Sequence, residues 1–502
     1  MERHVETLTD AANHILDKKQ EKAAEPEDRL TYVVGAAGSG KSMVLCERVV
    51  RICERALASE PPHILVTTFN KPMLKQLIMW TKQRISASTQ NLTLIDIGGY
   101  YQLSVSNARQ VDCKIRFLNR DKLPTRVWQT LPSNRPVLEV DGLEASAFDE
   151  SANELFDVDF IYKELELVVL GMDAWEHERY VDPAITARHG RRQRLTRRQR
   201  AELWPKLVAR ANVTKFPQVC LYRRLAAQRY YESTLASGKQ VRLRDSASPI
   251  THLLVDEGQD MTRSELRLLA RTPIKAQRLF VTGDTTQAIH TAGISPRPRI
   301  EGAQWEILTL VGSYRLPALV CEALQPLAEN ILARQSEASG SIPEVRRSAV
   351  PGPRPIVVDA SDTKEMVNAV ATMSSFEARN ASERSYWSLI CEPPTRDHVL
   401  AVTLRQHGLE AQCESMLKIK GLERPLVILP TDATPAFDEA IAEWVYTALT
   451  RSVCVLVIAV RPDTTPEVAN ALSHLDTRRQ NLMFWDQGAL SAWDQMLGSI
   501  SK

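Results

Sequence analysis

A glycine-rich octapeptide at residues 35–42 constrains the fold of this chain more than any other stretch. Its sequence, GAAGSGKS, fits the phosphate-binding pattern G-x-x-x-x-G-K-[ST]. The apolar run at 30–34 before it predicts a buried parallel strand, and residues 43–56 after it predict a helix. In that context the backbone N–H groups of the loop and the positive end of the helix face an anion. The sequence therefore predicts an α/β domain that binds a nucleotide.

Different residues of the loop have different roles in binding a nucleotide. Glycines let the backbone curve so that its N–H groups meet phosphate oxygens. Lys41 can reach the β- and γ-phosphates, and the hydroxyl of Ser42 can ligate Mg²⁺. The residues expected to bind nucleotide here are Gly35, Gly38, Ser39, Gly40, Lys41 and Ser42.

The chain has 502 residues, too many for one hydrophobic core, so we expect two to four domains. Its net charge of +2 does not by itself indicate a nucleic-acid partner. A local cluster of basic residues would be needed for that inference. The 8 cysteines show no metal-binding spacing, which fits a reducing compartment. No apolar run approaches a membrane span, and the N-terminus begins no signal peptide, so we expect a cytoplasmic location.

Two further strands are predicted to end in polar groups suited to phosphate chemistry. The run at 252–255 precedes Asp256 and Glu257, of which the first would help to hold Mg²⁺ and the second would orient or deprotonate a water. The alternative is that Asp256 caps the next helix. The run at 278–282 leads to Gln287, which could contact the γ-phosphate or the water. The distance from Lys41 to Asp256 exceeds one compact core, so we expect an inserted domain at 105–215.

Three stretches are candidates for base or backbone contacts. Gln20 could read an adenine edge, or it could be an ordinary solvated helix residue. After the predicted strand 64–68, an aromatic, an amide and a cation could stack a base and hold a phosphate; they are Phe69, Asn70 and Lys71. Seven arginines crowd into 13 residues, and they are Arg188, Arg191, Arg192, Arg194, Arg197, Arg198 and Arg200. They would contact a phosphate backbone, or else form a solvated face or pair with the acids between 149 and 166.

The remainder of the chain alternates strands and helices, which predicts a second doubly wound parallel sheet. The expected strands are 355–358, 386–391, 426–429 and 453–460. The expected helices are 316–334, 363–377, 396–408 and 437–449.

Taken in chain order, the motifs resemble those of superfamily 1 helicases of the UvrD/Rep/PcrA type. Residues 256–260, DEGQD, match the family's D-E-x-Q-D, and residues 283–287, GDTTQ, match its G-D-x-x-Q. Tyr314-Arg315 matches its Tyr-Arg element, residues 420–423 match its K-G-L-E, and residues 447–452, TALTRS, resemble its last motif. Gln20 falls where the family keeps its adenine-reading glutamine.

The resemblance implies two RecA-like P-loop domains that clamp ATP and Mg²⁺ between them. It makes Asp256 a metal ligand with Ser42 and makes Glu257 the activator of water. It places Gln287, Arg315 and Arg451 at the γ-phosphate and Glu423 at the ribose. The expected domains are 1–104 with 216–290 for the first RecA-like unit, 105–215 for a mainly helical insertion, and 291–502 for the second unit.

Three departures from the family concern strand contacts and leave the ATP motifs intact. Residues 96–98 replace the family's T-F-H, Leu417 stands in place of a histidine, and residues 288–292 lack the base-stacking aromatics. The interval from Arg315 to Ser415 is also too short for the second large accessory domain. We therefore expect an ATPase that moves on single-stranded or junction DNA. The alternative is an ATP-driven switch that regulates a partner nuclease in bacterial defence or repair.

Overall fold

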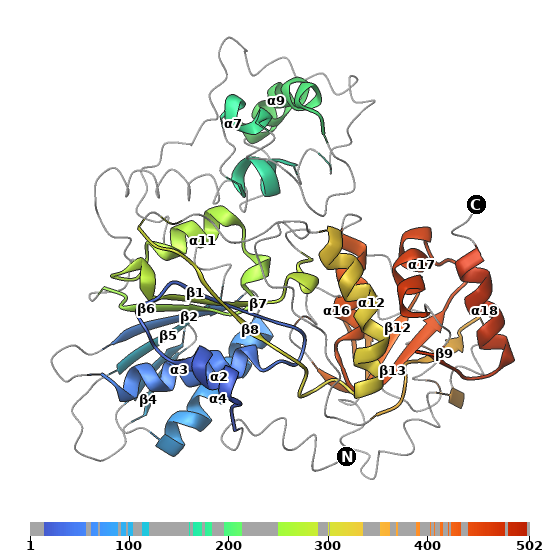
Figure 1. The fold of residues 1–502 in the computed structure, drawn as a ribbon, viewed down its shortest axis with the longest axis horizontal. Coiled ribbons are helices and arrows are strands. Elements are labelled where there is room, and N and C mark those ends of the chain that lie inside the picture. The colour runs from blue at the N-terminus through green and yellow to red at the C-terminus, as the bar shows by residue number, and fades with distance from the viewer. Residues whose placement is uncertain are drawn as a thin grey trace.

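The computed structural model describes residues 15–56, 62–68, 71–88, 92–96, 99–103, 113–119, 160, 164–172, 176–182, 195–212, 249–289, 300, 302–334, 352–361, 368–369, 388–391, 402, 406, 412–414, 420, 423–432, 440–476 and 480–498. Two β-sheets lie side by side in it, each with helices packed on it (Figure 1). The prediction of two parallel sheets flanked by helices is confirmed.

The first sheet has eight strands in the order β4-β3-β5-β2-β6-β7-β1-β8. All pairs are parallel except β3 with β4. The strands are β1 (Thr31–Gly35), β2 (His63–Thr68), β3 (Leu92–Asp96), β4 (Gly99–Leu103), β5 (Cys113–Asn119), β6 (His252–Val255), β7 (Leu279–Gly283) and β8 (Glu306–Leu310). Every residue of β1, β2 and β7 is buried, as expected for central parallel strands covered on both faces.

Alternate residues of the central strands enter two separate cores, because successive side chains point to opposite faces of a sheet. Val33 and Phe280 pack with the helices α3 (Lys41–Glu54) and α4 (Lys71–Ser88). Tyr32 and Val281 pack instead with α11 (Arg263–Ala270). The short helix α2 (Lys18–Ala24) joins the α3 side through Ala23 and Ala24.

The second sheet has six strands, all parallel, in the order β11-β10-β12-β13-β9-β14. They are β9 (Ile356–Asp359), β10 (Ser388–Cys391), β11 (Gln412–Glu414), β12 (Arg424–Pro430), β13 (Ser452–Val460) and β14 (Met483–Phe484). The helices of this unit are α12 (Ala318–Arg334), α16 (Ile441–Leu449), α17 (Pro466–Ser473) and α18 (Gln487–Gly498). Its 3-10 turn is η8 (His474–Asp476). Three further 3-10 turns lie among the elements of the first sheet: η3 (Gly258–Asp260), η4 (Ala276–Arg278) and η5 (Thr285–Gln287).

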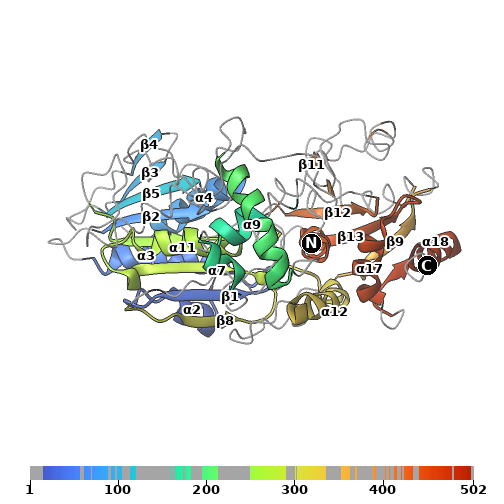
Figure 2. The ribbon, with the colours of Figure 1, turned by 90° about the horizontal axis from the view of Figure 1, so that it is seen from above.

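Between β5 and β6 the described chain is helical, with η2 (Glu164–Leu170), α7 (His177–Val181) and α9 (Arg197–Asn212). These helices share a small core in which Tyr180 donates to Glu164 at 2.6 Å and its ring lies 5.5 Å from that of Trp204. They lie above the first sheet in Figure 1, and in the view from above in Figure 2 they lie in front of the rest of the molecule.

Two strands of the first sheet lie outside the residues that the sequence assigned to that unit. β5 (Cys113–Asn119) pairs with β2 and β3, so the sheet extends past the expected boundary at 104. β8 (Glu306–Leu310) pairs with β1, so this sheet also includes a strand after residue 290. The expected helices at 363–377 and 396–408 fall mostly outside the described residues. None of the described helices is both long and apolar enough to cross a membrane.

Candidate functional site: the junction of the two sheets

The glycine-rich loop leaves β1 and enters α3 through two left-handed residues. Gly40 has φ 84, and a Cβ there would lie 2.4 Å from Nε2 of Gln20. Gly38 has φ 75, and a Cβ there would lie 2.3 Å from Oγ of Ser313. Only glycine fits both the backbone conformation and the space. The loop is therefore in contact with α2 on one side and with the segment after β8 on the other.

Lys41 and Ser42 begin α3 and point to the carboxyl ends of the strands. Nζ of Lys41 donates to the carbonyls of Gly35 and Ala36 at 2.8 and 3.0 Å. Oγ of Ser42 donates to Oδ2 of Asp256 at 2.8 Å. The structure thus brings the predicted lysine, hydroxyl and carboxylate together, although 214 residues separate Ser42 from Asp256.

Asp256 follows β6 and is fully buried. Its Oδ1 accepts from the hydroxyl of Thr282 and from the backbone N–H of Glu257, the latter at 3.1 Å. Burial, followed by the neighbouring charge of Glu257, raises the pKa of Asp256 to about 6, while the two hydroxyl donors act in the opposite direction. This carboxylate is held rigidly by donors from three different segments.

Glu257 is the one non-glycine residue with positive φ among the described residues, at φ 57 and ψ 43. Such a left-handed backbone costs energy for a residue with a Cβ, and it aims this side chain differently from a regular turn. Burial would raise the pKa of Glu257, but the charges of Lys420, Lys41 and Arg451 and the hydrogen bond from Gln259 together hold it below its usual value. The carboxylate is therefore kept in the ionised form that accepts protons.

A chain of amides and carboxylates runs from Glu257 to the edge of the first unit. Nε2 of Gln259 donates to Glu257, and Oε1 of Gln259 accepts from the backbone of Asp284 at 3.0 Å. Oδ2 of Asp284 in turn accepts from Nε2 of Gln287 at 2.7 Å. Each side-chain amide uses its donor and its acceptor at once, so the orientation of every group is fixed by its neighbours.

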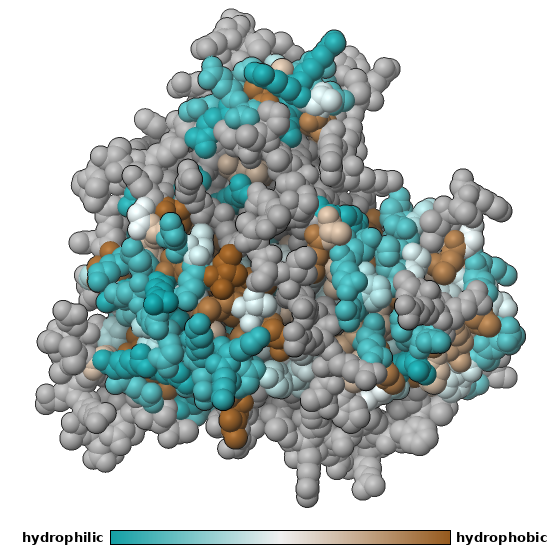
Figure 3. Space-filling view, viewed as in Figure 1, coloured by the Kyte–Doolittle hydropathy of each residue, from teal (hydrophilic) through white to brown (hydrophobic). Residues whose placement is uncertain are grey.

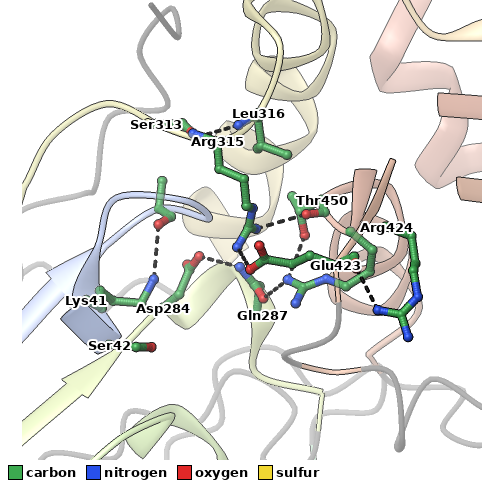
Figure 4. A network of polar contacts seen from close by, with 12 residues as sticks. Lys41, Ser42, Asp284, Gln287, Ser313, Arg315, Leu316, Glu423, Arg424 and Thr450 are labelled. Atoms are coloured by element: carbon green, nitrogen blue, oxygen red, sulfur yellow. Dashed lines mark hydrogen bonds and ion pairs between the residues drawn. The ribbon is translucent and has the colours of Figure 1, made fainter. Parts of the chain in front are cut away.

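The chain continues into the second unit at Gln287. Its Oε1 accepts from Nη2 of Arg451 at 2.6 Å, and Arg451 is itself fixed by the carbonyl of Thr447 at 2.9 Å. Figure 4 shows Gln287 between Asp284 and the residues around Thr450. Arg451, only 3% exposed, thus lies directly against the predicted γ-phosphate glutamine.

A second contact at the junction joins Arg315, in the segment between β8 and α12, to Glu423. Nη1 of Arg315 pairs with the carboxylate of Glu423, and its Nη2 donates to the carbonyl of Thr450 at 3.0 Å. Figure 4 shows the Arg315 side chain running from its segment toward these two residues. Glu423, expected at a ribose, therefore has a guanidinium as its partner in this structure.

A buried ion pair joins the units beneath these contacts. Nζ of Lys420 lies 2.6 Å from Oδ2 of Asp260, and the two side chains are 1% and 0% exposed. The same ammonium donates to the backbone carbonyl of Gln287. Lys420 therefore ties the second unit to both the 256–260 and the 283–287 motifs of the first.

Gln20 lies 1% exposed in α2 and contacts the loop directly. Its Nε2 donates to the carbonyl of Ser39 at 2.9 Å, and its Oε1 accepts from the backbone of Asp17 at 3.0 Å. One N–H and one lone pair of the amide remain for another group. Tyr314 contacts Asp17 through its hydroxyl and is 38% exposed beside the same helix.

The oxygen ligands at Ser42 and Asp256 fit Mg²⁺, which is bound through one or two carboxylates and otherwise by phosphates and waters. The described residues contain no cluster of three or more His, Cys, Asp or Glu side chains that could hold a metal ion by themselves. Magnesium at this place would therefore be shared with the phosphates of a nucleotide.

The predicted strand-binding residues are placed only in part. Phe69, Asn70, Arg191 and Arg192 lie outside the described residues, and Lys71 is the first residue of α4. Arg197 and Arg198 are exposed on α9, and Arg198 pairs with Glu202 at 2.8 Å.

Arg200 does not belong to an exposed basic patch. It is 4% exposed, and burial lowers its pKa against the opposing charges of Tyr180 and Asp182. The helical period of α9 turns this residue inward, which a count of arginines along the sequence does not reveal. In the upper part of Figure 3, where Figure 1 places α7 and α9, most of the coloured surface is hydrophilic.

Sequence reasoning assigned no individual role to Gln259, Asp260, Lys420 and Arg48. The first three stand inside recognised motifs, so their motif positions were the available signal. Arg48 stands on the buried face of α3 between Leu45 and Val49, and an arginine at a core position was the signal there.

This chain is similar to one protein family and to solved structures. The model of the UvrD/REP helicase N-terminal domain matches residues 16–291, more than half of the chain. No match is found among curated protein sequences. Among solved structures, the arterivirus helicase nonstructural protein 10 is similar at 10% identity with a TM-score of 0.35, and its complex with DNA at 12% identity with a TM-score of 0.36. The alignments cover 92% and 91% of this chain but 65% of each viral helicase. From its family match, this chain is a member of the UvrD/REP helicase family.

Proposed function

We propose that this protein hydrolyses ATP at the junction of its two α/β units and uses the resulting closure and opening to move along single-stranded DNA. The observation that carries the proposal is the hydrogen bond between Gln287 and Arg451, at 2.6 Å across the junction. Through Asp284 and Gln259 this contact is connected to Glu257. A change at the γ-phosphate would therefore alter contacts in both units.

In this proposal the first unit supplies the groups that bind phosphate and activate water. Lys41 exchanges its loop carbonyls for β- and γ-phosphate oxygens. Ser42 and Asp256 would hold Mg²⁺, which would supply charge neutralisation on those oxygens. Glu257 accepts a proton from the attacking water, for which its lowered pKa keeps it ionised. Gln20 and Tyr314 lie on the side of the loop where the base would sit.

The second unit supplies the arginines. Arg451 and Arg315 would stabilise the charge that spreads over the equatorial oxygens during transfer, for which a planar guanidinium fork is suited. When nucleotide is bound, Glu423 would exchange part of its contact with Arg315 for the ribose. We further propose that residues 306–310 close the first unit, that the helices between β5 and β6 form an accessory domain, and that the exposed α9 arginines contact the DNA backbone.

The test is ATP turnover with and without single-stranded DNA, on the whole chain and on Arg451→Ala. We expect DNA to stimulate turnover and Arg451→Ala to lower it by on the order of 1,000-fold, since an arginine at this position in phosphoryl transfer contributes that much. Turnover that is fast but indifferent to DNA would support an ATP-driven switch acting on a partner nuclease instead. Full turnover by Arg451→Ala would contradict the proposal that both units contribute to the ATP site.

A further inference from the structure

The helix that carries Gln20 is too short to hold its own shape. α2 has 7 residues, whereas isolated helices shorter than about 12–15 residues are marginal in water. At its N-terminus a capping box satisfies the N–H groups of Asp17, Lys19 and Gln20. Its C-terminal carbonyls need other partners, because the last four in any helix have none within it.

Two arginines of the phosphate-loop helix provide such partners: Nη1 of Arg51 donates to the carbonyl of Glu21 at 3.2 Å, and Arg48 contacts carbonyls at the end of α2 and just after it. Nη1 of Arg48 donates to the carbonyls of Ala23, at 3.2 Å, and of Glu25, and its Nη2 donates to the carbonyl of Glu27 at 3.0 Å. The side chain is 5% exposed although it carries a charge. Three carbonyl groups from the end of α2 and the chain just after it therefore converge on one guanidinium.

The same guanidinium also contacts the sheet. Its central carbon lies 4.5 Å from the centre of the Phe280 ring in β7, within the range of a cation–π contact. Burial lowers the pKa of Arg48 to about 10, against the opposing charges of Glu27, Glu306, Glu25 and Asp28. The group thus remains charged at neutral pH and bridges α2, α3 and the strand that leads to Gln287.

We infer that Arg48 is a positioning residue that fixes α2 against the phosphate loop and thereby sets the nucleobase preference of the site. The geometry on which this depends is the distance between the amide of Gln20 and the carbonyl of Ser39, 2.9 Å, which Gly40 makes possible. With Arg48 in place, α2 is held at both ends and the free donor and acceptor of Gln20 have one position. Without it, the carbonyls of Ala23, Glu25 and Glu27 lose this donor, so the end of α2 is held less tightly by its remaining contacts, while the phosphate loop keeps its own contacts.

This inference rests on the proposed ATP site, so the experiment measures binding rather than turnover. Equilibrium dissociation constants are compared for ATP, GTP and inorganic triphosphate, with the whole chain as the reference. In Arg48→Met, which keeps the aliphatic stem, ATP affinity should fall on the order of 10-fold and the preference for ATP over GTP should shrink by the same factor. Affinity for inorganic triphosphate, which has no base, should change by less than about twofold.

Arg55→Met is the matched control, because Arg55 pairs with the carboxylate of the same Glu25 but its side chain is 57% exposed and contacts no α2 carbonyl. It should leave all three affinities unchanged. Arg48→Lys, which keeps the charge but has no planar fork, should give an intermediate loss, and it replaces Arg48→Met if that variant does not fold. Gln20→Ala combined with Arg48→Met should be no worse than Gln20→Ala alone, since both changes remove the same contact.

Two results would overturn the inference: equal losses for ATP and inorganic triphosphate, or additive effects of Gln20→Ala and Arg48→Met. A reference protein that binds ATP no better than inorganic triphosphate would instead contradict the proposed ATP site. The failure of the inference and the failure of the proposed function are therefore separable.

Discussion

Glu257 has a strained backbone, and its depressed pKa keeps its carboxylate ionised at neutral pH. Its left-handed φ of 57 would serve no purpose in a residue that merely followed a strand. Glu257→Gln keeps the size and the hydrogen bond to Gln259 but removes the charge. We expect ATP binding within a few-fold of the reference and hydrolysis slower by on the order of 100-fold or more.

Rapid-quench measurement of a single turnover tests this directly. Glu202→Gln, the same chemical change on the exposed face of α9, is the control and should leave turnover unaltered. Near-normal hydrolysis by Glu257→Gln would assign the activation of water to another group.

Glu47 shows how one carboxylate contributes to stability. Burial would raise its pKa, but Arg84 and Arg51 outweigh burial and hold it below the ordinary 4.5. A carboxyl whose folded pKa is depressed adds stability above its unfolded pKa and loses it as pH falls through the folded pKa. Glu47→Gln should therefore lower the free energy of unfolding by about 1 kcal/mol at pH 7.

The difference between Glu47→Gln and the reference should narrow as pH drops below about 4.5 and approach zero in stronger acid. Denaturant unfolding at a series of pH values measures it. A difference that stays constant over that range would mean that Glu47 acts through packing and not through its charge.

At the scale of elements, α9 separates two uses of arginine. Arg197 and Arg198 face solvent, whereas Arg200 faces the core of the inserted helices. We predict that changing Arg191, Arg192, Arg197 and Arg198 to Ala weakens binding to all DNA sequences alike. The slope of log affinity against log salt should fall by roughly 0.7 to 0.9 for each phosphate that the variant no longer neutralises.

DNA binding across a salt series, with a melting curve beside it, checks this prediction. ATPase without DNA should survive, since no nucleotide motif is changed. An unchanged slope with a lowered melting temperature would make these arginines structural. Arg200→Ala supplies the comparison, because a buried change should lower the melting temperature by itself.

Most individual elements could be predicted from the sequence, because central parallel strands are continuous apolar runs. Such runs coincide with the strands β1, β2, β6, β7, β12 and β13. Assignment of strands to sheets was less accurate. β5 stands next to the insertion in sequence and β8 stands after the last first-unit motif, yet both pair in the first sheet. Strand order depends on long-range pairing, which local periodicity does not encode.

The candidate site was predicted to the extent that its residues belong to motifs. The approach of Ser42 to Asp256 and of Gln287 to Arg451 agrees with the expected groups. The role of Arg48 could not be derived, because it acts on backbone carbonyls and any sequence provides those. The left-handed backbone conformation of Glu257 could not be predicted for a similar reason, because tertiary contacts impose that conformation.

At the scale of the whole molecule, the pair of Lys420 and Asp260 determines whether the two units stay together. Both groups are fully buried, so removing one leaves the other charged and without solvent. Lys420→Met should cost about 3–5 kcal/mol, and opening of the junction can relieve part of that cost by admitting water to Asp260. We expect a larger radius of gyration by small-angle X-ray scattering.

The double variant Lys420→Met with Asp260→Leu is the control, since it replaces the pair by apolar groups and should restore a compact shape. Scattering curves that are identical for the reference and Lys420→Met, despite a loss of stability, would show that the other contacts alone keep the units together.

The position of β1 has a consequence for how the protein is made. Both neighbours of β1 come late in the chain, because they begin at Leu279 and at Glu306. A ribosome adds about 5–20 residues per second, so the nascent phosphate loop waits on the order of tens of seconds before its strand can be enclosed. During that interval its apolar residues are available to chaperones and to other nascent chains. Slower translation of the inserted helices would lengthen this exposure and lower the yield of folded protein without altering a single contact of the finished molecule.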